Sequence, residues 1–267
     1  MSCQINPHHI IKRKHDKTPI VMLTAYDYLT AELVTEAGID FILVGDSLGN
    51  VFSGHTTTLP VTIEQIIYHT QAVKRGAPKS LVVADMPFLS YEVSIEAAKQ
   101  NAGRLLKEGQ AQAVKIETNA SNINTIKDII GMGIPVMGHL GFTPQRVYQQ
   151  GGYKVQGREK EAEENILHLA KELERVGCFA VVLEMVPQQL AQKITESLSI
   201  PTIGIGAGVH CDGQVLVTQD LLGLTTKKPP KFVKQYDNLA TASVNAISTF
   251  IDEVTTKKFP SNGHAFE

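Results

Sequence analysis

The sequence predicts an α/β protein folded as a single (β/α)8 barrel, also called a TIM barrel, on three observations. Short apolar runs alternate with longer amphipathic segments, which is typical of parallel strands connected by helices. Eight such runs can be counted, and the chain of 267 residues is close to the ~250 usual for this barrel. Since no change in composition marks a second domain, we expect one barrel domain over residues 1–267, with a short lead at 1–18 and a loose tail at 256–267.

The strands are predicted from apolar runs rich in β-branched residues, because a parallel strand is buried on both faces. The run Phe41-Ile42-Leu43-Val44 is the clearest example. The same pattern predicts strands at residues 19–24, 41–44, 80–84, 113–116, 135–139, 179–183, 201–205 and 214–217. The eighth of these runs carries the weakest strand pattern. Alternation with helices implies a parallel sheet, and the count of eight favours a closed barrel over an open doubly wound sheet.

Amphipathic segments that follow the strands predict the helices. The segment 28–38 stops at a glycine, which favours a helix C-terminus, and Pro187 suits the first turn of a helix. Further helices are expected near residues 62–75, 94–108, 123–131, 159–176 and 239–255. Two connections, 50–60 and 141–157, are longer than usual. Long loops in compact domains are often lids or binding loops, and disordered insertions are the alternative.

Composition excludes several classes of partner. The chain has 25 Lys+Arg against 27 Asp+Glu, a net charge of −2, and no long basic cluster, so nucleic acid and anionic membranes are not expected partners. No apolar run is long enough to cross a bilayer, and the N-terminus lacks a secretory pattern. Three scattered cysteines without Cys-x-x-Cys spacing argue against a disulfide framework. We therefore expect a cytoplasmic protein.

Acidic residues recur where predicted strands end. Asp46, Asp85, Glu117 and Glu184 follow the second, third, fourth and sixth strands, and the carboxyl ends of all barrel strands meet at the mouth where such enzymes keep their active sites. Any one of these acids could instead cap a helix or form a loop salt bridge. Four carboxylates at one mouth repel each other unless a cation or raised pKa values offset the charge. Oxygen ligands favour a hard ion such as Mg²⁺ over Zn²⁺.

Other polar residues near these acids are further candidates. Lys115 lies two residues before Glu117, so both point to the same side of the strand. It can pair with a neighbouring carboxylate or hold a substrate carboxylate or enolate, and the two roles are compatible. Glu184 has apolar sequence neighbours that favour a raised pKa and a general-base role, the alternative being an ion pair with Lys115. Ser47 could cap a helix or contact a ligand. His139 is a secondary candidate for a ligand or acid–base group, and the alternative is a histidine that only hydrogen-bonds to the residues of the site.

Several motifs, taken together and in order, resemble the ketopantoate hydroxymethyltransferase family. The similarity runs from about residue 7 to residue 260 and is specific as a set rather than in any one motif. The motifs are Val44–Gly49, Gly54-His55, Thr58–Thr62, Tyr68–Thr70, Ala84–Phe88, Val114–Glu117, Gly138–Gly141, Gly151–Gly157, Leu183-Glu184, Gly204–Gly208 and Asp212–Gln214.

The resemblance implies both an activity and a set of residue roles. The family transfers a hydroxymethyl group from 5,10-methylenetetrahydrofolate to 3-methyl-2-oxobutanoate through a Mg²⁺-stabilised enolate, for pantothenate and coenzyme A synthesis. By this resemblance Asp46, Asp85 and Glu117 match the ligands of one Mg²⁺ per subunit, and Glu184 matches the proton acceptor. Asp46, Ser47, Asp85 and Lys115 match the keto-acid contacts. The resemblance also implies a homodecamer.

Without the family resemblance, the candidate residues are also compatible with two other functions. One is another metal-dependent barrel enzyme, a carbon–carbon lyase or mutase that acts on a 2-oxo acid such as oxaloacetate without a one-carbon donor. The other is a non-catalytic barrel that senses a keto acid. Exchange of the C3 hydrogen of 3-methyl-2-oxobutanoate is expected for the hydroxymethyltransferase. Absence of exchange together with turnover of oxaloacetate would indicate the lyase or mutase, and binding without turnover would indicate the sensor.

Overall fold

A computed structural model describes residues 5–225 and 228–266 of the chain. The chain divides into two compact units, Met1–Val217 and Thr218–Glu267, and each is described by itself below. The expectation of one domain over residues 1–267, with its lead and tail, stays a prediction.

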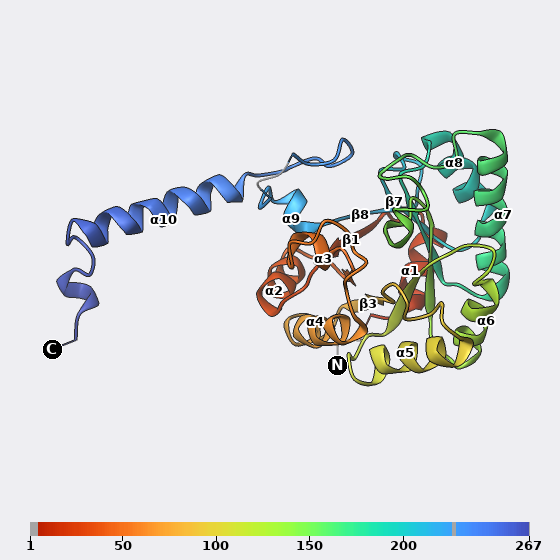
Figure 1. Ribbon diagram of the computed structural model, residues 1–267, viewed down its shortest axis with the longest axis horizontal. Helices are drawn as coiled ribbons and strands as arrows, with labels where there is room; N and C mark the ends of the chain where they lie inside the picture. The colour runs from red at the N-terminus through yellow and green to blue at the C-terminus, as the bar shows by residue number, and fades with distance from the viewer. Residues whose placement is uncertain (1–4, 226–227, 267) are drawn as a thin grey trace. The chain divides into compact units, whose positions relative to one another are not determined.

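The first unit is a closed barrel of parallel strands, which confirms the predicted fold class (Figure 1). Each strand pairs with its neighbours in chain order, and β8 pairs with β1 to close the cylinder. The strands are β1 Ile20–Thr24, β2 Phe41–Val44, β3 Leu81–Asp85, β4 Ala113–Glu117, β5 Val136–Gly141, β6 Ala180–Glu184, β7 Thr202–Ile205 and β8 Gly213–Leu216. The acids at residues 85, 117 and 184 are thus the last residues of their strands rather than the first residues after them.

Helices connect the strands, and α4 to α8 form an outer ring around the barrel (Figure 1). Side-chain oxygens of Asp27, Thr62 and Ser94 accept N–H groups in the first turns of α2, α4 and α5, which explains where these helices begin. The helices of this unit are α1 Pro7–His15, α2 Tyr28–Glu36, α3 Leu48–Val51, α4 Ile63–Gly76, α5 Ile95–Lys107, α6 Ile123–Gly131, the 3₁₀ turn η1 Pro144–Arg146, α7 Lys160–Val176 and α8 Gln188–Ser197.

Successive side chains of each strand point alternately into the barrel and out toward the helices, which gives an inner and an outer layer of side chains. The inner cluster includes Phe41, Val83, Met137 and Val182, and Ile10 of α1 packs against it. The next inward residues along β3, β4, β5 and β6 are polar, because side chains two positions apart share a face. The apolar filling of the barrel therefore stops one layer below its mouth, and the polar side chains occupy the last layer.

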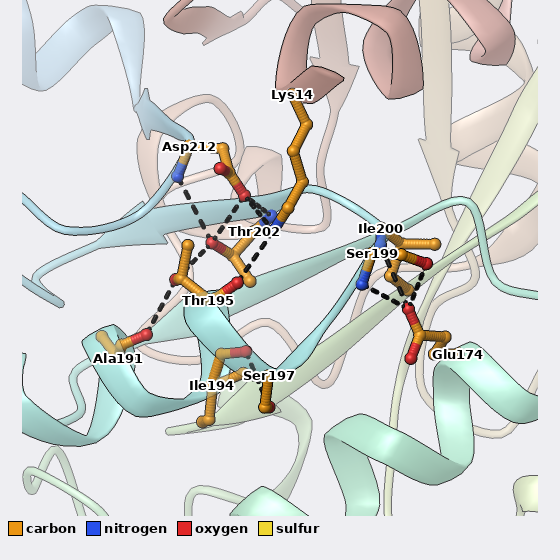
Figure 2. A network of polar contacts seen from close by, with 10 residues as sticks. All are labelled: Lys14, Glu174, Ala191, Ile194, Thr195, Ser197, Ser199, Ile200, Thr202 and Asp212. Atoms are coloured by element: carbon orange, nitrogen blue, oxygen red, sulfur yellow. Dashed lines mark hydrogen bonds and ion pairs between the residues drawn. The ribbon is translucent and has the colours of Figure 1, made fainter. Parts of the chain in front are cut away.

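Helix α1 packs against the inner cluster through Ile10, and a polar network anchors the helix (Figure 2). The Lys14 ammonium donates to the carbonyl of Thr195 at 2.9 Å and pairs with Asp212 Oδ2 at 3.0 Å. The same Asp212 oxygen accepts the backbone N–H of Thr202 at 2.8 Å. One lysine thus joins α1 to α8, to β7 and to the residue before β8.

The second unit contains α9 Thr218–Leu221, α10 Leu239–Thr255 and the 3₁₀ turn η2 Asn262–His264. Along α10, apolar residues recur at helical spacing at positions 244, 247, 250, 251 and 254, which places them on one face of the helix. Over the described ranges, the structure contains no helix with the length and apolar character needed to cross a membrane.

Candidate active site

The predicted site residues lie in the last inner layer at the carboxyl end of the barrel. The strand register pairs Asp85 with Lys115 and Glu117 with His139, each pair on adjacent strands. Residue 184, at the end of β6, is paired in register with Gly141. Parallel pairing with this register brings residues that are far apart in sequence to one end of the cylinder.

Asp46 and Asp85 lie side by side at the ends of β2 and β3. The backbone N–H of Asp46 donates to Asp85 Oδ2 at 2.8 Å, and both residues are buried. A Cβ atom at Gly45 would lie 2.9 Å from Ser47 Oγ and 3.3 Å from Asp85 Oδ2, so a glycine at this position permits the close approach. Burial, followed by the negative charge of Asp85, raises the pKa of Asp46 to about 7.

Lys115 supplies the positive charge of this layer. Its ammonium lies 2.8 Å from Asp85 Oδ1 and 3.3 Å from His139 Nδ1. Burial acts to lower the pKa of Lys115, but the carboxylates of Asp85, Asp46 and Glu117 outweigh it and raise that pKa. The lysine is therefore charged at neutral pH and offsets part of the negative charge around it.

Glu117 is held by a residue that the sequence patterns did not identify. Both of its carboxylate oxygens accept the backbone N–H of Gln145, at 3.1 and 3.2 Å. The Gln145 side chain donates to Asp46 Oδ2 at 2.8 Å, and Tyr91 donates to Gln145 Oε1 at 2.6 Å. Gln145 lies in the long loop expected at 141–157, where strand and helix periodicity carry no signal about single residues.

Glu184 lies at the most open position among these acids, with 16% of its side chain exposed. Its Oε2 is 3.2 Å from His139 Nε2, although Nε2 has no aligned hydrogen bond within the described residues. Burial, reinforced by the positive charge of Lys115, holds the pKa of His139 well below its usual range. Burial also raises the pKa of Glu184 to about 7, with Lys115 opposing the shift. A neutral histidine therefore faces a carboxyl group that exchanges its proton near neutral pH.

Ser47 borders the same layer and contacts a buried tyrosine. Its Oγ lies 2.8 Å from the Tyr26 hydroxyl, a separation at which either oxygen can donate. Ser47 occupies the N-cap position of α3, but its side chain caps none of that helix's described N–H groups. Of its two expected roles, the helix cap is therefore not formed, and the hydroxyl stays beside Asp46.

The oxygen donors of this layer fit a hard divalent cation in their chemistry. Asp85 Oδ1, though paired with Lys115, accepts no aligned hydrogen bond from any described residue, so lone pairs remain for a cation. Within the described part of the chain, no three His, Cys, Asp or Glu side chains form a preassembled metal site. The assignment of Asp46, Asp85 and Glu117 as ligands stays a prediction, and Glu117 is directed toward the N–H of Gln145.

Comparison with known proteins identifies relatives over nearly the whole chain. A family model described as ketopantoate hydroxymethyltransferase matches residues 4–262. The chain is 54% identical over 257 residues to 3-methyl-2-oxobutanoate hydroxymethyltransferase of Geobacter metallireducens, with 96% of each chain covered. It is 55% identical over 258 residues to the protein of the same name from Thermosipho africanus, with 97% of each covered.

Solved structures with a similar fold are distant in sequence. A crystal structure of 2,3-dimethylmalate lyase, a member of the PEP mutase/isocitrate lyase superfamily, matches with a TM-score of 0.62 at 14% identity. The match covers 96% of this chain and 89% of that one. At this identity the similarity supports the barrel fold alone.

Proposed function

This chain belongs to the ketopantoate hydroxymethyltransferase family, and on that premise we propose that it converts 3-methyl-2-oxobutanoate into 2-dehydropantoate. The one-carbon donor in this proposal is 5,10-methylenetetrahydrofolate, and the product enters pantothenate and coenzyme A synthesis. The observation that carries the proposal is the family match over residues 4–262. The side chains at the barrel mouth are also suited to removing a proton beside a keto group.

Glu184 is the proposed proton acceptor. A general base works best when its pKa lies near the working pH, and burial brings the pKa of Glu184 to about 7. Its carboxylate has a neutral imidazole beside it rather than an ion-pair partner. A neutral neighbour leaves the carboxylate free to take the C3 proton of the keto acid.

Asp46, Asp85 and Glu117 are the proposed residues for one Mg²⁺, with Glu117 acting through water. When bound, the ion supplies Lewis-acid polarisation of the keto group, which makes the neighbouring C–H more acidic. Lys115 and Ser47, with Asp46 and Asp85, are the proposed contacts of the keto acid. The Lys115 ammonium also places a fixed positive charge where the substrate's negative charge develops.

The proposal includes a homo-oligomer, and by family resemblance a decamer. The molar mass in solution, measured by light scattering, tests this part. A monomer at micromolar concentration would contradict it.

Hydrogen exchange tests the proposed chemistry before the folate enters. With Mg²⁺ in D₂O, the C3 hydrogen of 3-methyl-2-oxobutanoate should exchange, and adding 5,10-methylenetetrahydrofolate should yield 2-dehydropantoate. Absence of exchange together with turnover of oxaloacetate would favour a carbon–carbon lyase instead. Binding of the keto acid without exchange would favour a sensor.

The metal assignment has its own test. Asp85→Ala should weaken Mg²⁺ binding, measured by calorimetry, because it removes a buried oxygen donor of the site. The same variant leaves Lys115 without its ion-pair partner, so its melting temperature should be measured alongside. An unchanged Mg²⁺ titration in folded Asp85→Ala would show that the assignment is wrong.

A further inference from the structure

We propose that Gln145 is a positioning residue that orients the carboxylates of Asp46 and Glu117 for the divalent cation, and that Tyr91 acts through it. This inference rests on the proposed function, because it concerns the cation assigned to those carboxylates. None of these positioning contacts follows from the strand pattern, since Gln145 and Tyr91 both lie in loops.

The backbone of Gln145 fixes Glu117. The Gln145 N–H is shared between both carboxylate oxygens of Glu117, at 3.1 and 3.2 Å. The residue lies in the η1 turn, where Pro144 occupies the first position and restricts the backbone. A shared N–H holds the carboxylate symmetrically and so controls the direction in which its remaining lone pairs point.

The side chain of Gln145 fixes Asp46. Its Nε2 donates to Asp46 Oδ2 at 2.8 Å and to the carbonyl of Met86 at 3.0 Å. Both hydrogens of the amide nitrogen are therefore used. The side chain is buried, so water does not compete for these contacts, and one oxygen of Asp46 is held in place.

Tyr91 holds the oxygen of the Gln145 amide. The Tyr91 hydroxyl donates to Gln145 Oε1 at 2.6 Å, and Tyr91 is itself buried. A flipped amide would set its oxygen against the Asp46 carboxylate and the Met86 carbonyl, both of which are acceptors. Asp46 and Met86 thus set which way the amide is turned, and the hydrogen bond from Tyr91 holds its oxygen in that orientation.

Through these contacts one loop residue joins two barrel strands. Asp46 follows β2 and Glu117 ends β4, while Gln145 comes from the loop after β5. Residues that hydrogen-bond to metal ligands without touching the metal commonly determine the orientation of those ligands. Mutation of such residues weakens metal affinity by about 10- to 100-fold. We expect an effect of that size here.

The test measures metal affinity in folded protein with Gln145→Met, which keeps the backbone N–H and similar side-chain length but removes the amide. Mn²⁺, followed by electron paramagnetic resonance, is the probe, since it shares the oxygen preference of Mg²⁺. Gln145→Met should bind Mn²⁺ about 10- to 100-fold more weakly than wild type. At saturating Mg²⁺ the C3 exchange rate should return toward the wild-type value, because Glu184 is unchanged.

Tyr91→Phe supplies a second and milder variant, which removes only the hydroxyl. It should weaken Mn²⁺ binding in the same direction, and the double variant should bind no more weakly than Gln145→Met alone. Such non-additivity is expected when one residue acts through another. Additive losses would show that Tyr91 does not act through Gln145.

Two neighbouring glutamines provide matched controls. Gln149 is exposed in the same loop, so Gln149→Met should leave Mn²⁺ affinity unchanged. Gln150 holds the loop through Thr143 and Gly141, so Gln150→Met reports on loosening of the loop alone.

Wild-type Mn²⁺ affinity in folded Gln145→Met overturns the inference. If Gln145→Met does not fold, wild-type Mn²⁺ affinity in Tyr91→Phe overturns it instead. Failure of wild type itself to bind Mn²⁺ or Mg²⁺ would instead overturn the proposed metal site and this inference with it.

Discussion

Lys115 and Glu184, at the mouth of the barrel, have different carboxylate and imidazole partners. Lys115 pairs with Asp85, while Glu184 faces the neutral imidazole of His139. The expected alternative, an ion pair between Lys115 and Glu184, is therefore not the arrangement found. A carboxyl group without a cationic partner keeps a pKa near 7, whereas a direct ion pair would lower it.

Glu184→Gln is expected to reduce C3 hydrogen exchange of 3-methyl-2-oxobutanoate by ~10²-fold or more, because the amide cannot accept the proton. Mg²⁺ and keto-acid binding should be retained, since the substitution keeps the shape of the side chain. The rates are measured by NMR in D₂O. Glu161→Gln, at an exposed position of α7, is the matched control, and a wild-type rate in Glu184→Gln would remove this residue from the base role.

At the scale of single elements, the ends of the strands determine where the site residues lie. Gly141 ends β5 with φ = +95°, and a Cβ atom there would meet the carbonyl oxygen of Glu184 and the side chain of Val186. The backbone N–H of Phe142 also donates to that carbonyl at 2.8 Å. Where β5 ends, the backbone passes directly against the last residue of β6. This close approach requires a glycine at position 141.

Gly141→Ala should lower the free energy of unfolding by at least about 1–3 kcal/mol, because alanine is strained at this φ and its Cβ has no space. Urea denaturation measures the change. Gly103→Ala is the control, since no atom lies within 4 Å of its added Cβ and the residue is inside α5. That variant should be more stable by roughly 0.5–1 kcal/mol. Equal effects at the two positions would show that β5 tolerates a side chain at its end.

Helix α1 offers a second prediction at this scale. Lys14→Met should lower the free energy of unfolding by about 1–3 kcal/mol, because Lys14 and Asp212 are only 15% and 18% exposed and Asp212 would lose its charged partner. Lys12→Met removes an ion pair whose partners are 72% and 49% exposed, and should change stability by less than about 1 kcal/mol. Thermal and urea unfolding of both variants make the comparison. C3 exchange should be unaffected in either, since both residues lie at the opposite end of the barrel.

For the whole molecule, the buried acids couple stability to pH. The pKa of Glu184 rises from 4.5 to about 7 on folding, mainly through burial, so the folded state binds this proton more tightly than the unfolded state. The resulting contribution to stability is fully present below pH 4.5 and is lost as the pH rises through about 7.

Comparison of wild type with Glu184→Gln isolates this contribution from those of other groups. The free energy of unfolding of wild type relative to the variant should fall as the pH rises from 4.5 to about 7. Urea denaturation at a series of pH values measures it. A difference that is constant over this range would mean that folding does not change the pKa of Glu184.

Most strand and helix positions could be predicted from the sequence, because a buried parallel strand and an amphipathic helix each have a local signature. The run at 41–44 coincides with β2, and the helix expected at 123–131 coincides with α6. Strand ends were less accurate, since β3, β4 and β6 each extend to include their terminal acid. The roles of Gln145 and Tyr91 could not be predicted, because a loop residue acquires its partners only from the path of the loop.

By itself, the sequence determined that acids would gather at one end of a barrel, because the carboxyl ends of parallel strands share a rim. The tertiary structure decided which partner each charge takes: Asp85 for Lys115, His139 for Glu184, and the backbone N–H of Gln145 for Glu117. These choices depend on strand register and loop path. Both are set by packing between segments far apart in the chain, and local sequence patterns carry no record of them.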